Sequence, residues 1–110
     1  MSTPLKAQHC KPREGEAALP RERAEALLKE LSGWTLDAAR GTIERTWKFR
    51  NFHETMAFVN ALAWVAHRED HHPDLEVGYN RCQVRFHTHS VKGLTENDFI
   101  CAAHLDALGV

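Results

Sequence analysis

The order of secondary structure in this chain is set by residues 42–73, which read TIERTWKFRNFHETMAFVNALAWVAHREDHHP. Ile43 and Trp47 lie in a run where apolar and polar residues alternate, and this pattern predicts a strand with one buried face. From Asn51, a good helix cap, apolar residues recur at helical spacing as far as about Glu69. The proline that closes the stretch cannot continue a helix. The stretch therefore predicts a strand followed by the longest helix of the chain.

The apolar stripe of this helix is wide. It contains Phe52, Met56, Val59, Ala63 and Ala66 at helical spacing, widened by Phe58, Leu62 and Val65. Large aromatic residues in a chain of this length belong mostly to the core, so we expect the tryptophans, including Trp64, and Tyr79 to be buried.

Further elements extend from this stretch in both directions. A helix is expected from Pro20, and a strand at residues 34–36 pairs with residues 43–49 across a turn near residues 39–41. A second hairpin is expected at residues 75–88, and Thr95 to Asp98 match a capping box before a last helix. The order α-β-β-α-β-β-α predicts an α+β fold. We expect a two-layer sandwich, a four-stranded antiparallel sheet with helices on one face.

The two ends of the chain differ in composition. Residues 1–18 are polar, with two prolines and a glycine, and are expected to form a flexible N-terminal arm with little to bury. Residues 19–110 are expected to form a single domain. We see no signal peptide and no apolar run of about 20 residues, so we expect a cytoplasmic protein that does not enter a membrane.

Charge and cysteine content exclude some classes of protein. The 110 residues carry a formal net charge of -1, whereas nucleic-acid binding needs a basic surface, so we expect no nucleic-acid partner. The three cysteines are widely spaced and none forms a C-x-x-C pair, which argues against a disulfide framework or a cysteine zinc site. Free thiols are the simplest interpretation.

Histidines are concentrated between His67 and His89. His71 and His72 stand at the end of the long helix, where adjacent side chains point in different directions and could serve two atoms of one ligand, while Pro73 fixes their backbone. Histidine exchanges protons near neutral pH, with an ordinary pKa of about 6.5. The spacing alone favours two solvated histidines at a helix end.

A metal site is the competing interpretation of this cluster. His67 and His71 lie one helical turn apart, close to the inverted zincin pattern H-x-x-E-H, with Asp70 in the place of the glutamate. The helix has to stop at the proline, and the sequence fixes no third ligand nearby. We therefore expect no bound metal.

The end of the second hairpin holds another candidate group. His87 and His89 alternate with Thr88, which places both histidines on the face opposite the buried strand residues. An exposed strand end explains them without a function. Asp98 is similarly ambiguous, because its place in the capping box already accounts for it.

Four ordered segments carry a resemblance to a known family: Asp70-His71-His72-Pro73-Asp74, Val77-Gly78-Tyr79-Asn80, Thr88-His89, and Gly93-Leu94-Thr95-Glu96-Asn97-Asp98-Phe99. In order and spacing they resemble the pterin-4a-carbinolamine dehydratases. The similarity also includes Gly33-Trp34 and Phe49-Arg50-Asn51-Phe52, and covers roughly residues 20–108. One departure is Leu75-Glu76, where some relatives have aromatic residues, which leaves substrate preference open.

The resemblance implies a homo-oligomer, either a dimer or a tetramer of dimers. It implies a lyase that dehydrates 4a-hydroxytetrahydropterin (4a-hydroxytetrahydrobiopterin) to quinonoid dihydropterin, in tetrahydropterin recycling beside aromatic amino-acid hydroxylases. The implied catalytic residues are His71, His72 and His89. The implied substrate contacts add Pro73, Thr88, Ser90, Val91 and Asp98.

The implied reaction suits these residue types. Loss of the 4a-hydroxyl group requires a proton delivered to the leaving oxygen and a proton removed from a ring nitrogen. Histidines in different protonation states can do both, so we expect no cofactor. The alternative is a non-catalytic interaction module on the same fold, a dimerisation or regulatory cofactor; the intact His71-His72-Pro73 and His89 favour the enzyme.

Overall fold

The computed structural model describes residues 3–110. Its elements are η1 (Leu5–Ala7), α1 (Arg21–Leu28), β1 (Thr35–Asp37), β2 (Thr42–Lys48), α2 (Phe52–Glu69), β3 (Asp74–Val77), β4 (Arg81–Phe86), η2 (His89–Val91) and α3 (Glu96–Asp106). The predicted order α-β-β-α-β-β-α is confirmed. The two short 3-10 turns, η1 and η2, were not expected.

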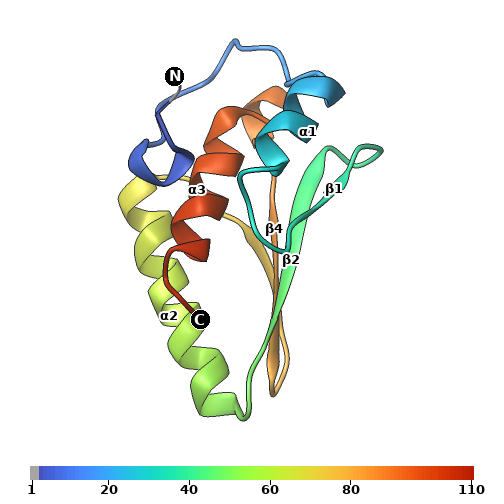
Figure 1. Cartoon of the computed structure of the whole chain (residues 1–110). Helices are drawn as coiled ribbons and strands as arrows, with labels where there is room; N and C mark the ends of the chain where they lie inside the picture. The colour runs from blue at the N-terminus through green and yellow to red at the C-terminus, as the bar shows by residue number, and fades with distance from the viewer. Residues whose placement is uncertain (1–2) are drawn as a thin grey trace.

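The four strands form one antiparallel sheet in the order β1-β2-β4-β3. In the central pair, Ile43 of β2 lies opposite Phe86 of β4, and Lys48 lies opposite Arg81. Figure 1 shows α2 and α3 together on one side of this sheet. The α+β two-layer sandwich is therefore confirmed.

The core lies between the sheet and these helices. Alternation along β4 buries every second residue, from Cys82 to Phe86, and turns the intervening residues toward the other face. The largest fully buried apolar side chains come from both layers: Phe86, Phe99, Ile43, Ile100, Leu105 and Val84. Almost all of α3 is buried, which makes it the central helix of the domain.

Arg45 interrupts the apolar face of β2, and the structure shows how. Its guanidinium lies 4.2 Å from the ring centroid of Trp47, a cation–π contact, and its Nη1 donates to Oδ1 of Asp106 at 2.6 Å. The indole nitrogen of Trp34 donates to the same carboxylate at 2.8 Å. One carboxylate at the end of α3 thus fastens the helix to the β1–β2 side of the sheet.

The long helix α2 begins and ends where the sequence predicts. Oδ1 of Asn51 accepts from the backbone N–H of Glu54 at 2.9 Å, which confirms the cap. The helix ends at Glu69, and Asp70 follows in the left-handed conformation with φ of 51°. This reversal redirects the chain immediately before the histidine pair.

The predicted orientation of α2 is wrong in part. Its buried face is formed by Thr55, Phe58, Leu62, Val65, Ala66 and Glu69. Phe52 of this helix is 50% exposed. The expectation that Trp64 and Tyr79 are buried is also wrong, because each is 65% exposed. Because apolar residues cover more than half of the helix circumference, the pattern alone did not specify which strip faces the sheet.

The N-terminal segment has more to bury than its composition predicts. Leu5 in η1 is only 3% exposed and packs in the core cluster, in contact with α3. The expectation of little to bury is therefore wrong for this residue. The domain boundary at residue 18 and the flexibility of residues 1–18 stay predictions. Within residues 3–110, no helix has the length and apolar character needed to cross a membrane.

Candidate active site

His71 is held by a buried carboxylate. Its Nε2 donates to Oδ1 of Asp98 at 2.6 Å, and the imidazole stacks on the ring of Phe86 with centroids 5.8 Å apart and planes inclined by 9°. The backbone N–H of His71 also donates to the carbonyl of Ala66. The end of α2, the sheet and α3 therefore all contribute to fixing one ring.

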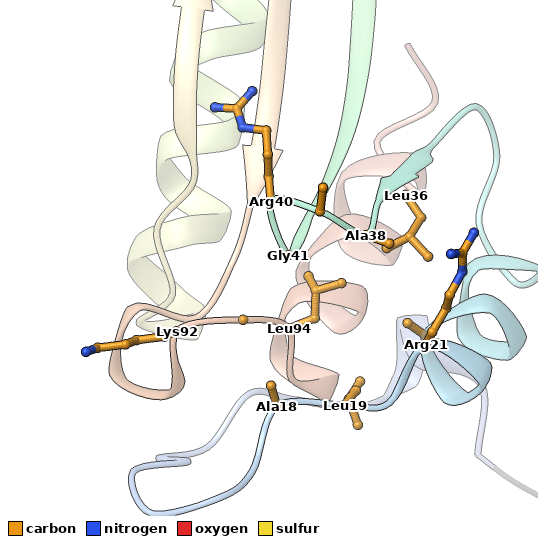
Figure 2. A pocket seen from close by; sticks show the side chains of 12 residues that line it. Ala18, Leu19, Arg21, Leu36, Ala38, Arg40, Gly41, Lys92 and Leu94 are labelled. Carbon is orange, nitrogen blue, oxygen red and sulfur yellow. The ribbon is translucent and has the colours of Figure 1, made fainter.

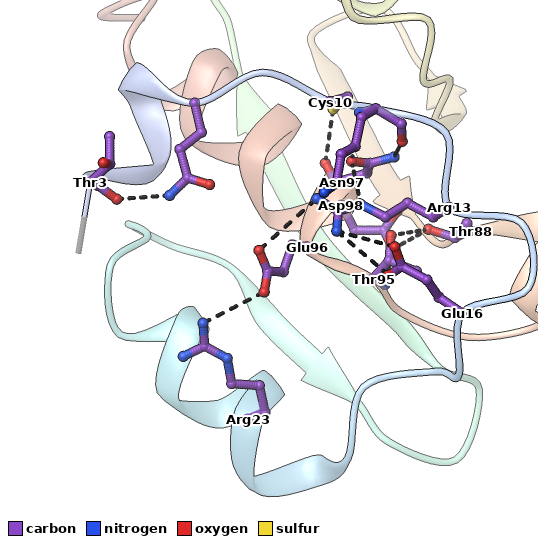
Figure 3. A network of polar contacts seen from close by, with 12 residues as sticks. Thr3, Cys10, Arg13, Glu16, Arg23, Thr88, Thr95, Glu96, Asn97 and Asp98 are labelled. Carbon is purple, nitrogen blue, oxygen red and sulfur yellow. Dashed lines mark hydrogen bonds and ion pairs between the residues drawn. The ribbon is translucent and has the colours of Figure 1, made fainter.

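Asp98 is fully buried at the start of α3. Its Oδ2 accepts from the backbone N–H of Thr95 at 2.9 Å, so the predicted capping box is confirmed. The same oxygen accepts from the Thr88 hydroxyl at 2.8 Å, and the Thr95 hydroxyl lies 2.7 Å from that hydroxyl. Figure 3 shows Thr88, Thr95 and Asp98 gathered in this way. Asp98 is thus both a helix cap and the partner of a candidate catalytic residue.

The chemistry of this pair follows from which atoms are occupied. A carboxylate that accepts a hydrogen bond from Nε2–H fixes the tautomer and the orientation of the imidazole. Nδ1 of His71 is then the ring atom that can take up or give a proton. This is the arrangement expected of a general acid or base.

The other predicted residues surround this pair less tightly. His72, His89 and Ser90 are exposed, whereas Pro73 and Val91 are partly buried. Thr88 belongs to the buried network around Asp98. The predicted residues therefore fall into two parts. One is a buried group around Asp98, and the other is an exposed rim formed by His72, His89 and Ser90.

The rim includes two residues that the predicted set omits. The ring centroid of His87 lies 4.0 Å from that of His89, and Nε2 of His87 lies 3.3 Å from Oδ2 of Asp74. These contacts link the end of β4 to the residue that follows Pro73. The alternation in His87-Thr88-His89 was visible in the sequence, but the partnership with Asp74 depends on the pairing of β3 with β4.

A cavity of about 200 Å³ opens beside His71. One wall comes from the predicted site, with His71, Thr88 and Ser90. A second wall is formed by the N-terminal segment and the helices that hold it: Cys10, Lys11, Pro12, Glu14, Glu69, Asp70 and Asn97. Nothing in the local sequence pattern connects residues 10–14 with the histidines.

Polar contacts of two buried side chains, Glu69 and Asn97, hold this second wall in place. Oε1 of Glu69 accepts from the backbone N–H of Cys10 at 2.8 Å. The side chain of Asn97 accepts from the N–H of Lys11 at 3.2 Å and donates to its carbonyl at 2.7 Å. Figure 3 shows the segment running past the start of α3 at this place.

Glu69 has a shifted pKa. Burial by itself raises the pKa of this carboxyl, but hydrogen bonds from the backbone of Cys10 and from His9 outweigh burial, so the net pKa is lowered. The folded N-terminal segment therefore stabilises the carboxylate form of Glu69.

A second cavity, of about 250 Å³, lies away from the histidines. Figure 2 shows it between Leu19, the β1–β2 turn at Arg40 and Gly41, and Leu94. A Cβ atom on Gly93 would meet the Cβ of Ala18 at 2.8 Å, so the chain needs glycine there for close packing. None of the predicted catalytic residues lines this cavity.

The zinc interpretation based on His67 and His71 gains no support from the geometry. Within residues 3–110, two groups have three ligand atoms within 4.8 Å of one another: His9, Glu69 and His104, and Asp74, His87 and His89. Neither group contains His67 or His71. In the first group, Nδ1 of His104 already lies 3.0 Å from Nη2 of Arg68. The absence of a resident metal stays a prediction.

Comparisons with known proteins agree with this architecture. The model of the family described as pterin 4 alpha carbinolamine dehydratase matches residues 17–108. A Nitrosomonas eutropha protein that carries this family's name is 57% identical over 106 residues, which is 94% of this chain and 92% of its own length. One from Legionella pneumophila is 53% identical over 110 residues, covering 98% of this chain and 97% of its own.

Solved structures add two similar folds. The crystal structure of a transcriptional coactivator/pterin dehydratase from Brucella melitensis has a TM-score of 0.79 and 33% identity, covering 84% of this chain and 99% of that one. A pterin dehydratase-like protein identified as a RuBisCO assembly factor in the alpha-carboxysome shares only the fold, at 22% identity and a TM-score of 0.60 over 70% of this chain and 89% of its own. On the family match and these relatives, the chain belongs to the pterin-4a-carbinolamine dehydratase family.

Proposed function

We propose that this protein dehydrates 4a-hydroxytetrahydropterin to quinonoid dihydropterin by histidine acid–base catalysis. The observation that carries the proposal is the 2.6 Å contact between His71 and the buried Asp98, at the wall of a cavity. Family membership indicates the class of reaction. The hydrogen-bonded His71 and Asp98 provide an oriented imidazole that can exchange protons in such a reaction.

The reaction divides between the two parts of the site. His71 approaches the substrate from the buried side, with Nδ1 available for proton exchange. His72 and His89 stand at the rim, where they can exchange protons with the substrate and with water. The substrate loses hydroxide from C4a as water once its oxygen is protonated, and a ring nitrogen loses its proton to a second group. Neither step requires an organic cofactor or a metal.

The decisive experiment is a turnover assay with chemically made 4a-hydroxytetrahydropterin. We expect the purified protein to accelerate formation of the quinonoid product well above the spontaneous rate. The matched control is His72→Ala, because its exposed side chain can be removed without disturbing the core. A parent protein that gives only the spontaneous rate would refute the proposal.

The cellular setting is part of the same proposal. Tetrahydropterin recycling places the enzyme in the cytoplasm beside an aromatic amino-acid hydroxylase, as a dimer or a tetramer of dimers. Co-purification or a rate increase in a coupled hydroxylase assay tests this setting.

A second function on the same fold is a regulatory interaction module. The Brucella melitensis protein is described as both a transcriptional coactivator and a pterin dehydratase, which supports this second candidate function. Site variants separate the two: a module keeps its partner binding when His71 and His72 are replaced, whereas an enzyme loses turnover.

A further inference from the structure

Two thiols that are distant in sequence meet beside the candidate site. Sγ of Cys10 lies 3.5 Å from Sγ of Cys101, although 91 positions separate the residues. Cys101 is fully buried on α3, and Cys10 is partly buried in the N-terminal segment. The third cysteine, Cys82, is buried in β4.

This thiol pair is close to the catalytic candidates. Cys101 follows Asp98 by three positions on α3, so both side chains lie on the same face of the helix. Sγ of Cys101 lies 4.0 Å from the carbonyl oxygen of His71, and Cys10 lines the cavity that His71 also lines. A covalent change at these sulfurs would act at the wall of that cavity.

We propose that Cys10 and Cys101 form an oxidation site, at which a peroxide converts the two thiols into an intramolecular disulfide that fastens the N-terminal segment to α3. The inference goes beyond the proposed function and does not depend on it. The bond would fix the cavity wall that Cys10 shares with Lys11, in addition to the hydrogen bonds between Lys11 and Asn97.

The geometry requires a small adjustment. A disulfide bond is about 2.05 Å long, so the sulfurs, now 3.5 Å apart, must approach by about 1.5 Å. Rotation of the two side chains can supply part of this movement, and the N-terminal segment can supply the rest.

The two steps balance with one peroxide. The sulfur of Cys10 attacks the peroxide, the O–O bond breaks, and one oxygen stays on sulfur as a sulfenic acid while the other leaves as water. The sulfur of Cys101 then attacks the sulfenic sulfur, and the hydroxyl group leaves as water with the proton of Cys101. Both sulfurs are oxidised by one electron each, and the peroxide is reduced to two waters.

The burial of the two thiols sets this order. The hydrogen bond with Cys10, burial and the nearby carboxylates of Glu69 and Asp98 raise the pKa of Cys101, which therefore stays protonated. The partly buried Cys10 is the sulfur that an oxidant reaches first. Burial likewise raises the pKa of Cys82, which makes it an internal control.

The test is to treat the full-length protein with a small excess of hydrogen peroxide and measure its intact mass without reductant. We expect a loss of the mass of two hydrogen atoms, a proteolytic fragment that joins the Cys10 and Cys101 peptides, and reversal by dithiothreitol. The melting temperature should rise by roughly 5 °C or more, because the bond closes a long loop.

Variants make the result specific. Cys10→Ser should abolish both the mass loss and the stabilisation, and because Cys10 is only partly buried this variant should fold; Cys82→Ala should keep both. Gain of one or more oxygen atoms without a cross-link, a disulfide between chains, or a cross-link to Cys82 would each overturn the proposal. The mass readout needs no substrate, so a failed turnover assay leaves this test intact.

Discussion

Nε2 of His71 lies 2.6 Å from Oδ1 of Asp98, across 27 positions of sequence. His71 follows the end of α2, and Asp98 caps the start of α3, so one hydrogen bond joins the two helices at the cavity. Asp98 also accepts from Thr88 and Thr95. A single carboxylate therefore both orients a candidate catalytic ring and completes a helix cap.

Asp98→Asn should lower kcat by more than it changes KM. The amide cannot accept every hydrogen bond that the carboxylate accepts, and it gives an imidazolium no counter-charge; the lost buried hydrogen bonds should also cost about 1–3 kcal/mol of stability. Steady-state kinetics and urea unfolding measure the two effects. Thr95→Ala is the matched control, since it weakens the same cap without touching His71. If both variants lose kcat equally, Asp98 acts only through the fold.

His72→Ala should slow dehydration by roughly 10²- to 10⁴-fold at an unchanged melting temperature. The side chain is exposed, so its removal costs little packing. His71→Ala should lose a similar factor in rate, but its side chain is only 11% exposed and Asp98 would lose a donor, so we also expect it to melt earlier. Single-turnover rates and thermal melts of both variants check this. An active His72→Ala protein would remove His72 from the mechanism.

His89→Ala should have a smaller effect on rate and a larger one on binding, because His89 stands at the rim beside His87. His67→Ala should be nearly silent, since its ring lies beside the exposed Trp64, with centroids 6.0 Å apart, on the outer side of α2. KM and kcat of the two variants give the comparison. A loss in His67→Ala as large as in His72→Ala, with the fold preserved, would mean that the site is centred elsewhere.

Glu69 should contribute stability that depends on pH. Its pKa in the folded protein is lowered, so its contribution is fully present above the ordinary glutamate pKa of about 4.3 and is lost as pH falls through the folded value. Glu69→Gln should lack this contribution, so its loss of stability relative to the parent should shrink below about pH 4. Urea midpoints across the acid range measure it. A difference that stays constant with pH would show that the Glu69 charge contributes nothing.

The protein should assemble into a dimer or a tetramer. Asn97 to Leu105 of α3 are buried within the chain, which leaves little of that helix for a contact between chains. The edge strands β1 and β3 stay available, and Trp64 offers an exposed apolar surface on α2. Light scattering at micromolar concentration should report a multiple of 12.5 kDa. A monomer at that concentration contradicts the prediction.

Much of the fold was predictable because its signals are local. Asn51 before an apolar run, the proline after His72 and the Thr95–Asp98 box each act within one turn of the chain, so the ends of α2 and the start of α3 follow from neighbouring residues. Alternation along β4 is likewise a local pattern, and every second residue of that strand is buried. The orientation of α2 was not predictable, because its apolar residues surround most of the helix and only packing against the sheet selects one strip.

The candidate site divides in the same way. The sequence by itself predicts His71, His72 and His89 as site residues, through motifs whose spacing resembles a known family. Only the tertiary structure showed that Asp98 contacts His71 as well as capping α3, that Asp74 meets His87, and that residues 10–14 form a wall of the cavity. The physical reason is the separation along the sequence. Capping and alternation arise from backbone geometry over a few residues. The contacts that form the site join groups as far apart as Cys10 and Asn97, which come together only once the helices pack on the sheet.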